Sequence, residues 1–172
     1  QKGFGLPAGL GVWMVNEKCI AKAEALFSAG KPIGSFHSLP SLIAHSRKNQ
    51  TPETPNVLGI YLLGKVVQDF LNRGIAALRS ETQYKGSLLY QALEKNATVK
   101  PFVAEKFNRS KTVVVAECGA RTQDLSEHLK KYNLYPGDGY GEFRKSQLRF
   151  ANFPAHSKEQ FELLADAIAS FQ

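Results

Sequence analysis

Cysteine is scarce in this chain of 172 residues, which contains only Cys19 and Cys118. Two cysteines are too few for a disulfide framework, and neither belongs to a Cys-x-x-Cys pair or to a cysteine and histidine cluster with zinc-site spacing. We therefore expect a chain from a reducing compartment, with a cytoplasmic location and no metal site.

Long apolar runs are also missing. The run from Val57 to Leu63 falls far short of the roughly 20 residues that a membrane-spanning helix needs. The chain also opens without the basic and then apolar segment of a secretory signal. The sequence therefore predicts a soluble, untargeted chain with no membrane partner.

Negative charge is in the minority, with 15 Asp and Glu against 22 Lys and Arg and a formal net charge of +7. An excess of basic residues is typical of nucleic-acid binding when they gather into a patch or stripe. Here they are spread over the whole length, in short pairs at Arg47-Lys48, Lys130-Lys131 and Arg144-Lys145. We interpret the charge as solvated surface and expect no nucleic-acid partner.

The first part of the chain predicts a strand, a helix and a long loop. The apolar run 11–15 is short and bounded by turn residues, as in a buried strand, and Asn16 would cap a helix over 17–29. The stretch 31–53 is rich in Pro, Ser, His and Gly, which predicts a long irregular loop with a short helix near 41–47.

A strongly apolar helix follows. Thr54 would be its N-cap and Pro55 its first helical residue, and Gly74 would end it. Gly59 and Gly64 lie inside it, where each costs about 1 kcal/mol relative to Ala. We therefore expect another segment to pack closely against this helix.

The remainder predicts a mixture of helices and strands. We expect helices over 75–94 and 122–132, strands over 102–107, 112–118 and 147–153, and a last helix that begins with a capping box at Ser157 and Gln160. The strands before and after the polar turn 108–110 would pair in antiparallel fashion.

This order predicts two different parts. Residues 96–172 could form a self-contained α+β domain, an antiparallel sheet covered by helices on one face. The part before residue 96 could not stand alone. The first part offers its apolar helix nothing adequate to pack against, so we expect a missing partner.

The start of the chain has an unusual composition. Gln1 and Lys2 lead directly into a glycine-dense loop, so the chain looks like part of a longer one. The glycines are Gly3, Gly5, Gly9 and Gly11. They would let the backbone approach a flat ligand, and Lys2 could then form a Schiff base with an aldehyde cofactor.

Four segments together resemble one family. They are Gln1 to Gly11 with its Pro-Ala-Gly-Leu, Thr51 to Asn56 before the long helix, Asn108-Arg109-Ser110, and Leu148 to Pro154. The chain is similar over nearly its whole length to class V, fold type I pyridoxal-phosphate-dependent aminotransferases, most closely to phosphoserine aminotransferases. The resemblance implies that residues 1–73 are the end of the large cofactor-binding α/β domain with an interdomain helix. It further implies that 74–95 are a connecting helix and 96–172 a small C-terminal α+β domain.

The resemblance assigns three residues to the cofactor. Lys2 would form the Schiff base with pyridoxal phosphate, and its freed amine would move the substrate Cα proton. Gln1 would lie beside the cofactor, near its phosphate. Thr54 would reach the cofactor phosphate of the other subunit of a homodimer, a role compatible with a simple N-cap.

Substrate binding would fall to the second part. Arg149 would hold the substrate α-carboxylate, with a surface salt bridge as the alternative. The family has a His-Arg pair shortly before this arginine, whereas this chain has Glu142-Phe143-Arg144-Lys145. Arg144 or Lys145 could still meet a substrate phosphate, or be loop cations, and His37 could line the site. Neither Cys19 nor Cys118 lies where a cysteine desulfurase would need it.

The resemblance implies transamination between an amino acid such as phosphoserine and 2-oxoglutarate. In this family the acidic partner of the pyridine nitrogen, the stacking aromatic and the phosphate cradle precede the lysine, so this chain alone should be inactive. Two alternatives stay open: another class V enzyme of the alanine-glyoxylate or serine-pyruvate type, and a non-catalytic aminotransferase-like module for binding or dimerisation.

Overall fold

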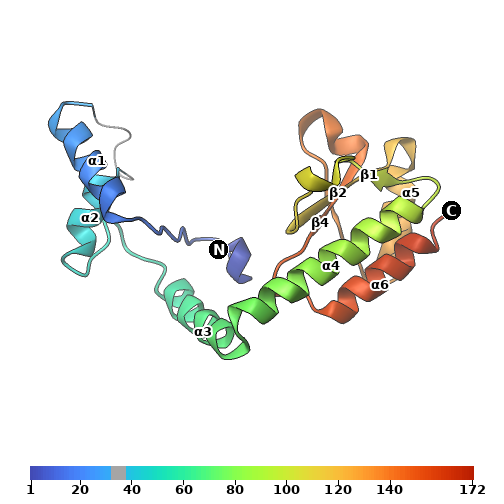
Figure 1. The fold of residues 1–172 in the computed structure, drawn as a ribbon, viewed down its shortest axis with the longest axis horizontal. Coiled ribbons are helices and arrows are strands. Elements are labelled where there is room, and N and C mark those ends of the chain that lie inside the picture. The colour runs from blue at the N-terminus through green and yellow to red at the C-terminus, as the bar shows by residue number, and fades with distance from the viewer. Residues whose placement is uncertain (32–37) are drawn as a thin grey trace. The chain divides into compact units, whose positions relative to one another are not determined.

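The computed structural model describes residues 1–31 and 38–172. It divides into two compact units, each described by itself (Figure 1). The first unit comprises Gln1 and Leu6–Gly64, and the second comprises Lys2–Gly5 and Lys65–Gln172. The expected domain boundaries at 73 and 95 stay predictions.

The first unit is helical. It contains α1 (Glu17–Ser28), α2 (Leu39–Ser46) and the beginning of α3 (Val57–Arg73). The expected cap of α1 is confirmed, because Asn16 Oδ1 accepts a hydrogen bond from the Cys19 amide at 3.0 Å. The short helix expected near 41–47 is α2.

The strand expected over 11–15 is wrong. These residues form no strand, and the side chains of Trp13 and Met14 are 60% and 90% exposed. A strand exists only where another segment completes its hydrogen-bond ladder, and none of the described residues of the first unit does so.

The helix expected to begin at Thr54 begins instead at Val57. Thr54 and Pro55 precede it, both exposed. Asn56 is the cap, since its Oδ1 accepts from the Gly59 amide at 2.9 Å. Asn caps helices at least as well as Thr, and in this structure Asn56 is the N-cap in place of Thr54.

Gly59 confirms the close packing expected of α3. A Cβ added there would lie 2.8 Å from Asn56 Nδ2 and 3.1 Å from Leu10 Cδ1. Apart from the adjacent backbone of α3 itself, no atom of the described chain would lie within 4 Å of a Cβ added at Gly64, so no other segment packs closely there.

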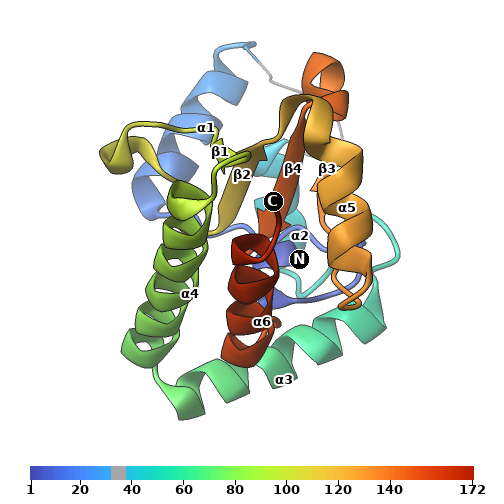
Figure 2. The same ribbon diagram turned by 90° about the vertical axis from the view of Figure 1, so that its right-hand side faces the viewer.

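The second unit is a four-stranded antiparallel sheet covered by helices. The strands are β1 (Lys100–Pro101), β2 (Val113–Glu117), β3 (Gly137–Asp138) and β4 (Gln147–Ala151), in the order β1-β2-β4-β3. The helices are α4 (Ile75–Lys95), α5 (Thr122–Lys130) and α6 (Lys158–Ala169). Figure 2 shows these helices in front of the sheet, with α4 and α6 side by side.

The core lies between the helices and one face of the sheet. Strands β2 and β4 pair over five residues, from Val113 opposite Ala151 to Glu117 opposite Gln147. Every second side chain enters the core, as strand geometry requires. The buried members are Val114, Ala116, Leu148 and Phe150 from the strands, with Leu89, Leu93, Leu125, Leu129, Phe161 and Ile168 from the helices.

Two local predictions hold in this unit. Gly74 separates α3 from α4 with a φ of 83°, a backbone conformation that favours glycine. The capping box that opens α6 is present, with Ser157 and Gln160 bonding each other's backbone.

The strand expected over 102–107 is wrong. The strand before the 108–110 turn is Lys100–Pro101, which pairs with β2, and a 3₁₀ turn occupies Lys106–Asn108. The Arg109 side chain takes the carbonyls that a strand would have offered, with Nε 3.0 Å from Val103 O and Nη2 3.1 Å from Ala104 O. The antiparallel pairing itself is confirmed.

None of the helices in the described residues combines the length and apolarity needed to cross a bilayer. Within residues 1–31 and 38–172, no group of three or more His, Cys, Asp and Glu could hold a metal ion.

Candidate active site

Lys2 lies in a short 3₁₀ turn that is packed into the second unit. The turn spans Lys2–Phe4 and is closed by the Gly5 amide, 3.0 Å from Lys2 O. Phe4 stacks on Phe70 of α3, with ring centroids 6.1 Å apart. The Lys2 side chain is exposed. Packing therefore fixes the backbone of the turn and leaves the lysine accessible.

Gly5 is required at the end of this turn. Its φ is 67°, and a Cβ added there would lie 2.8 Å from Ala155 Cβ. Both the left-handed backbone and the contact exclude a larger residue. The group that approaches Gly5 is Ala155 in the turn before α6, and the expected approach of a flat ligand to this backbone stays a prediction.

Gln1 stabilises the glycine loop of the first unit. Its Oε1 accepts from the Gly9 amide at 2.9 Å and from the Leu10 amide at 3.1 Å. These bonds occupy the acceptor end of the side chain. The amide N–H groups at the other end are the ones that could donate to a phosphate.

Thr54 is exposed and lies two residues before the helix cap, in the first unit. The N-terminus of a helix of this length offers unpaired amides and a positive dipole end to an anion. Thr54 is near that end in sequence without being part of the cap.

Arg149 projects from β4 on the sheet face opposite the buried strand residues. It pairs with Val115 of β2 and Gly137 of β3. A Cβ at Gly137 would lie 3.1 Å from Arg149 Nη2, so the absent side chain leaves room for the guanidinium.

Neutral groups hold Arg149 in place. Its Nε donates to the Asp138 carbonyl, and its guanidinium carbon lies 3.7 Å from the centroid of the Tyr140 ring. No carboxylate of the described chain lies within 4 Å of it, so the surface salt bridge is not seen. Tyr140 has no local signal in the sequence apart from its place in the glycine-rich loop before the strand of Arg149.

Arg144 and Lys145 belong to the 3₁₀ turn Gly141–Lys145, and both are exposed. Arg144 Nε lies 3.6 Å from a carboxylate oxygen of Asp138, whose backbone carbonyl holds Arg149. Both cations also line a hollow of about 550 Å³ against the beginning of α5, which Arg149 does not line. The structure thus connects Arg144 to Arg149 through Asp138 alone. His37 lies outside the described residues.

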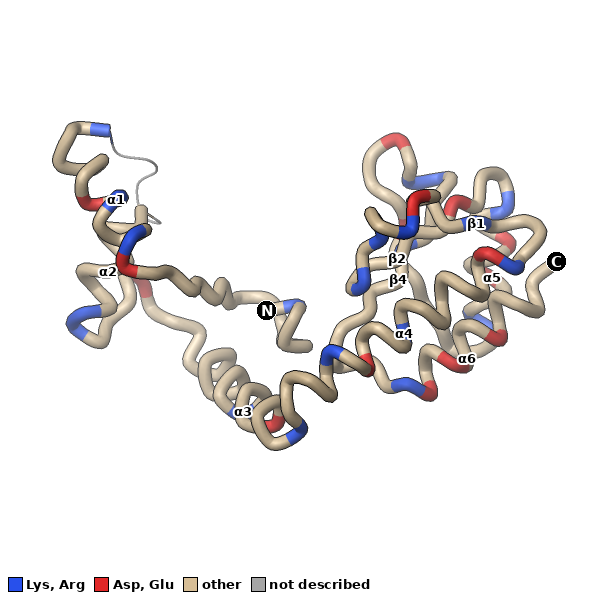
Figure 3. Tube along the Cα trace, viewed as in Figure 1, with Lys and Arg blue, Asp and Glu red and all other residues tan. Residues whose placement is uncertain are grey.

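Arg109, in the Asn108-Arg109-Ser110 segment, braces the turn that it follows. Arg109 donates to Glu94 Oε1 at 2.6 Å and lies over the Tyr90 ring at 4.7 Å, besides its two backbone carbonyls. This bond from Arg109 lowers the pKa of Glu94. Cations and anions alternate over the second unit and do not gather by sign (Figure 3).

Comparison with known proteins identifies the class. The family described as aminotransferase class-V matches residues 1–137. The chain therefore belongs to the class-V aminotransferases, whose cofactor is pyridoxal phosphate.

The individual relatives that the chain resembles include several phosphoserine aminotransferases. The chain is 27% identical over 172 residues to the phosphoserine aminotransferase of Nocardioides sp. and 28% identical to that of Rhodococcus opacus, covering 98% of this chain and 46% of each relative. The crystal structure of a phosphoserine aminotransferase from Cytophaga hutchinsonii is 40% identical with a TM-score of 0.88, over 96% of this chain and 46% of that one. This chain spans about half the length of these relatives.

More distant structures share the fold. An alanine-glyoxylate aminotransferase from Nostoc sp. is 19% identical with a TM-score of 0.76, over 97% of this chain and 45% of that one. At this identity the likeness shows the fold alone, an end of the large domain followed by a small domain with a helix-covered antiparallel sheet.

Proposed function

We propose that this chain carries the catalytic lysine and the carboxylate-binding arginine of an enzyme that transfers an amino group between phosphoserine and 2-oxoglutarate. The observation that carries the proposal is Arg149, a guanidinium held by neutral groups with no carboxylate of the described chain beside it. Such a cation is ready for a bidentate bond to a substrate carboxylate. The phosphoserine aminotransferases among the relatives support the substrate class.

The residues fit pyridoxal phosphate. Lys2 is an exposed amine on a packed turn, and Gly5 keeps bulk away from the same turn. When bound, the cofactor supplies an aldehyde that takes up amines and a ring that accepts electrons from the substrate Cα bond. The amine of Lys2 holds the cofactor and moves the proton at the substrate Cα.

The remaining roles concern anions. The side-chain amide of Gln1 and the hydroxyl of Thr54 contact the cofactor phosphate, Thr54 from the other subunit of a homodimer. Arg149 binds the substrate α-carboxylate, and Arg144 or Lys145 meets the substrate phosphate. The enzyme acts in the cytoplasm, in serine biosynthesis.

The full-length protein tests the role of Lys2. We expect Lys2→Ala to abolish both the visible absorption of the bound cofactor and transamination. Lys22→Ala, which removes another exposed lysine of the chain, should leave both unchanged. If Lys2→Ala behaves like Lys22→Ala, Lys2 is not the cofactor lysine. Because this chain spans about half its relatives' length, we expect it alone to be inactive.

A second candidate is a class V enzyme for an unphosphorylated amino acid, of the alanine-glyoxylate or serine-pyruvate type. It is favoured by the exposed pair Arg144 and Lys145 in place of a His-Arg pair, and by the hollow that both of these cations line and Arg149 does not. Comparing kcat/KM for phosphoserine and alanine separates the two. A preference for alanine would reject phosphoserine, and a full-length protein that binds no cofactor would support a non-catalytic module.

A further inference from the structure

The buried face of α4 contains a lysine. Lys85 is completely buried, on the face of α4 where Leu78, Leu89 and Ala92 enter the core. Burying an ammonium is unfavourable unless its N–H groups are paired. A charged residue at this position therefore indicates a specific arrangement of partners around it.

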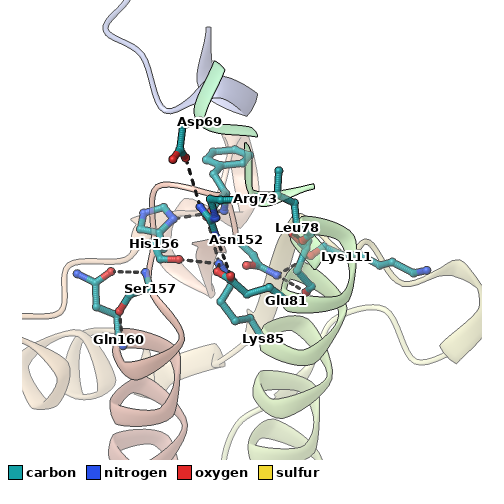
Figure 4. Close-up of polar contacts among 12 residues, drawn as sticks. Asp69, Arg73, Leu78, Glu81, Lys85, Lys111, Asn152, His156, Ser157 and Gln160 are labelled. Carbon is teal, nitrogen blue, oxygen red and sulfur yellow. Dashed lines mark hydrogen bonds and ion pairs between the residues drawn. The ribbon is translucent and has the colours of Figure 1, made fainter. Parts of the chain in front are cut away.

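Three acceptors surround the Lys85 ammonium (Figure 4). Its Nζ donates to His156 O at 2.6 Å and to Phe153 O at 3.4 Å, and lies 3.2 Å from Glu81 Oε1, one helical turn earlier. The first two acceptors are the ends of the 153–156 turn, which connects the segment after β4 to α6. Lys85 thus attaches this turn to α4.

Glu81 extends the arrangement to α3. Its other carboxylate oxygen lies 2.8 Å from Arg73 Nη2, and Arg73 Nη1 lies 3.7 Å from Asp69 (Figure 4). Charges of alternating sign therefore run from the end of α3 along α4 to the 153–156 turn.

The other side of the 153–156 turn faces the segment of Lys2. Ala155 is the residue that leaves no room for a Cβ on Gly5, directly after the Lys2–Phe4 turn. Arg149 lies in the strand that leads into the same turn, four residues before Phe153. One turn therefore contacts the segment of the proposed proton-transfer lysine and continues the strand of the proposed carboxylate-binding arginine.

We propose that Lys85 is a positioning residue that fixes the 153–156 turn and thereby sets Arg149 relative to Lys2. The inference rests on the roles proposed for Lys2 and Arg149. A substrate bound through its carboxylate presents its Cα to the Lys2 amine only when these two groups are correctly spaced. Lys85 touches neither substrate nor cofactor, and it acts through the turn.

The experiment uses the full-length enzyme with cofactor bound. Lys85→Met keeps much of the side-chain volume and removes the N–H groups and the charge, and Lys95→Met, at the exposed end of the same helix, is the matched control. We expect Lys85→Met to keep the cofactor absorption and lower kcat about 10- to 100-fold, as small misplacements of reacting groups do. Proton transfer should become rate-limiting, so the kinetic isotope effect with Cα-deuterated substrate should exceed that of Lys95→Met.

A merely structural role predicts a different result. If kcat of Lys85→Met falls only in proportion to the bound cofactor and the isotope effect equals that of Lys95→Met, the proposal is overturned. If Lys85→Met does not fold, Glu81→Gln removes the negative charge beside the ammonium while keeping an acceptor, and the same rise in the isotope effect is expected. An unchanged isotope effect in the folded Glu81→Gln enzyme would then reject the inference. If Lys2→Ala loses all activity while Lys85→Met has normal kinetics, the role of Lys85 is rejected and the proposed function stands.

Discussion

Asn96 joins the ends of two helices in the second unit. It follows α4 and is 5% exposed. Its Nδ2 donates to Ile168 O at 2.7 Å and Phe171 O at 2.8 Å, at the end of α6. Its Oδ1 accepts from the Thr98 amide at 2.8 Å, the Thr98 hydroxyl at 2.9 Å and the Val99 amide at 3.1 Å. Every hydrogen-bonding group of this side chain is used.

Replacing Asn96 by Ala should strongly destabilise the second unit. A buried hydrogen bond contributes about 1 kcal/mol net, and stranding its partner can cost more. The variant loses five hydrogen bonds, and water can then bind the carbonyls near the C-terminus and recover part of their free energy. We therefore expect the free energy of unfolding to fall by about 3–5 kcal/mol. Single domains are stable by only about 5–15 kcal/mol, so the change should be plain in any unfolding curve.

Urea denaturation of the full chain, followed by circular dichroism, measures this loss. Asn108→Ala is the matched control, because Asn108 is exposed in the 3₁₀ turn of the same unit. Asn96→Asp separates the two ends of the amide, since it keeps the acceptor and places an oxygen against two carbonyls. A loss in Asn96→Ala no larger than in Asn108→Ala, at unchanged m-value, would refute the reasoning.

Three further results are expected. Tyr140→Ala should raise the KM of a carboxylate substrate about two- to five-fold in the full-length enzyme, because an exposed cation–π contact to Arg149 contributes about 0.5–1 kcal/mol. Tyr140→Phe keeps the ring and should leave KM unchanged, and equal KM values in the two variants would contradict this reasoning. Burial raises the pKa of Cys118 to about 11, so Ellman's reagent at neutral pH should modify the exposed Cys19 and reach Cys118 only on unfolding. Burial lowers the pKa of His156, so the unfolded chain binds its proton first, and stability should fall as the pH decreases below about 6.5. Comparing urea midpoints of the wild type and His156→Asn at two pH values should show a smaller pH dependence in the variant.

Helices were predictable from the sequence because their signals are local. The apolar spacing, the glycine at 74 and the pair Ser157 and Gln160 all act within one or two turns, and the structure confirms them. The start of α3 was placed too early because Thr54 and Asn56 are both good caps, and sequence alone does not rank them.

Strands were less predictable because a strand depends on a distant partner. Residues 102–107 have the composition of a strand, but Arg109 binds carbonyls there that pairing would have needed. The support of Arg149 was missed for a similar reason. Asp138 and Tyr140 approach it only through the pairing of β3 with β4, a contact that no local pattern in the sequence encodes.

In the second unit, cations paired with carboxylates differ from Arg149, the proposed carboxylate-binding residue, in the groups that hold them. Arg73, Arg109 and Lys85 are neutralised by carboxylates at 2.6–3.2 Å, and each joins two segments of the fold. Arg149 is instead oriented by a backbone carbonyl and an aromatic ring, which do not cancel its charge. A guanidinium oriented by neutral partners keeps most of its attraction for an incoming carboxylate. The contrast favours a binding role for Arg149 over the structural role that the paired cations have.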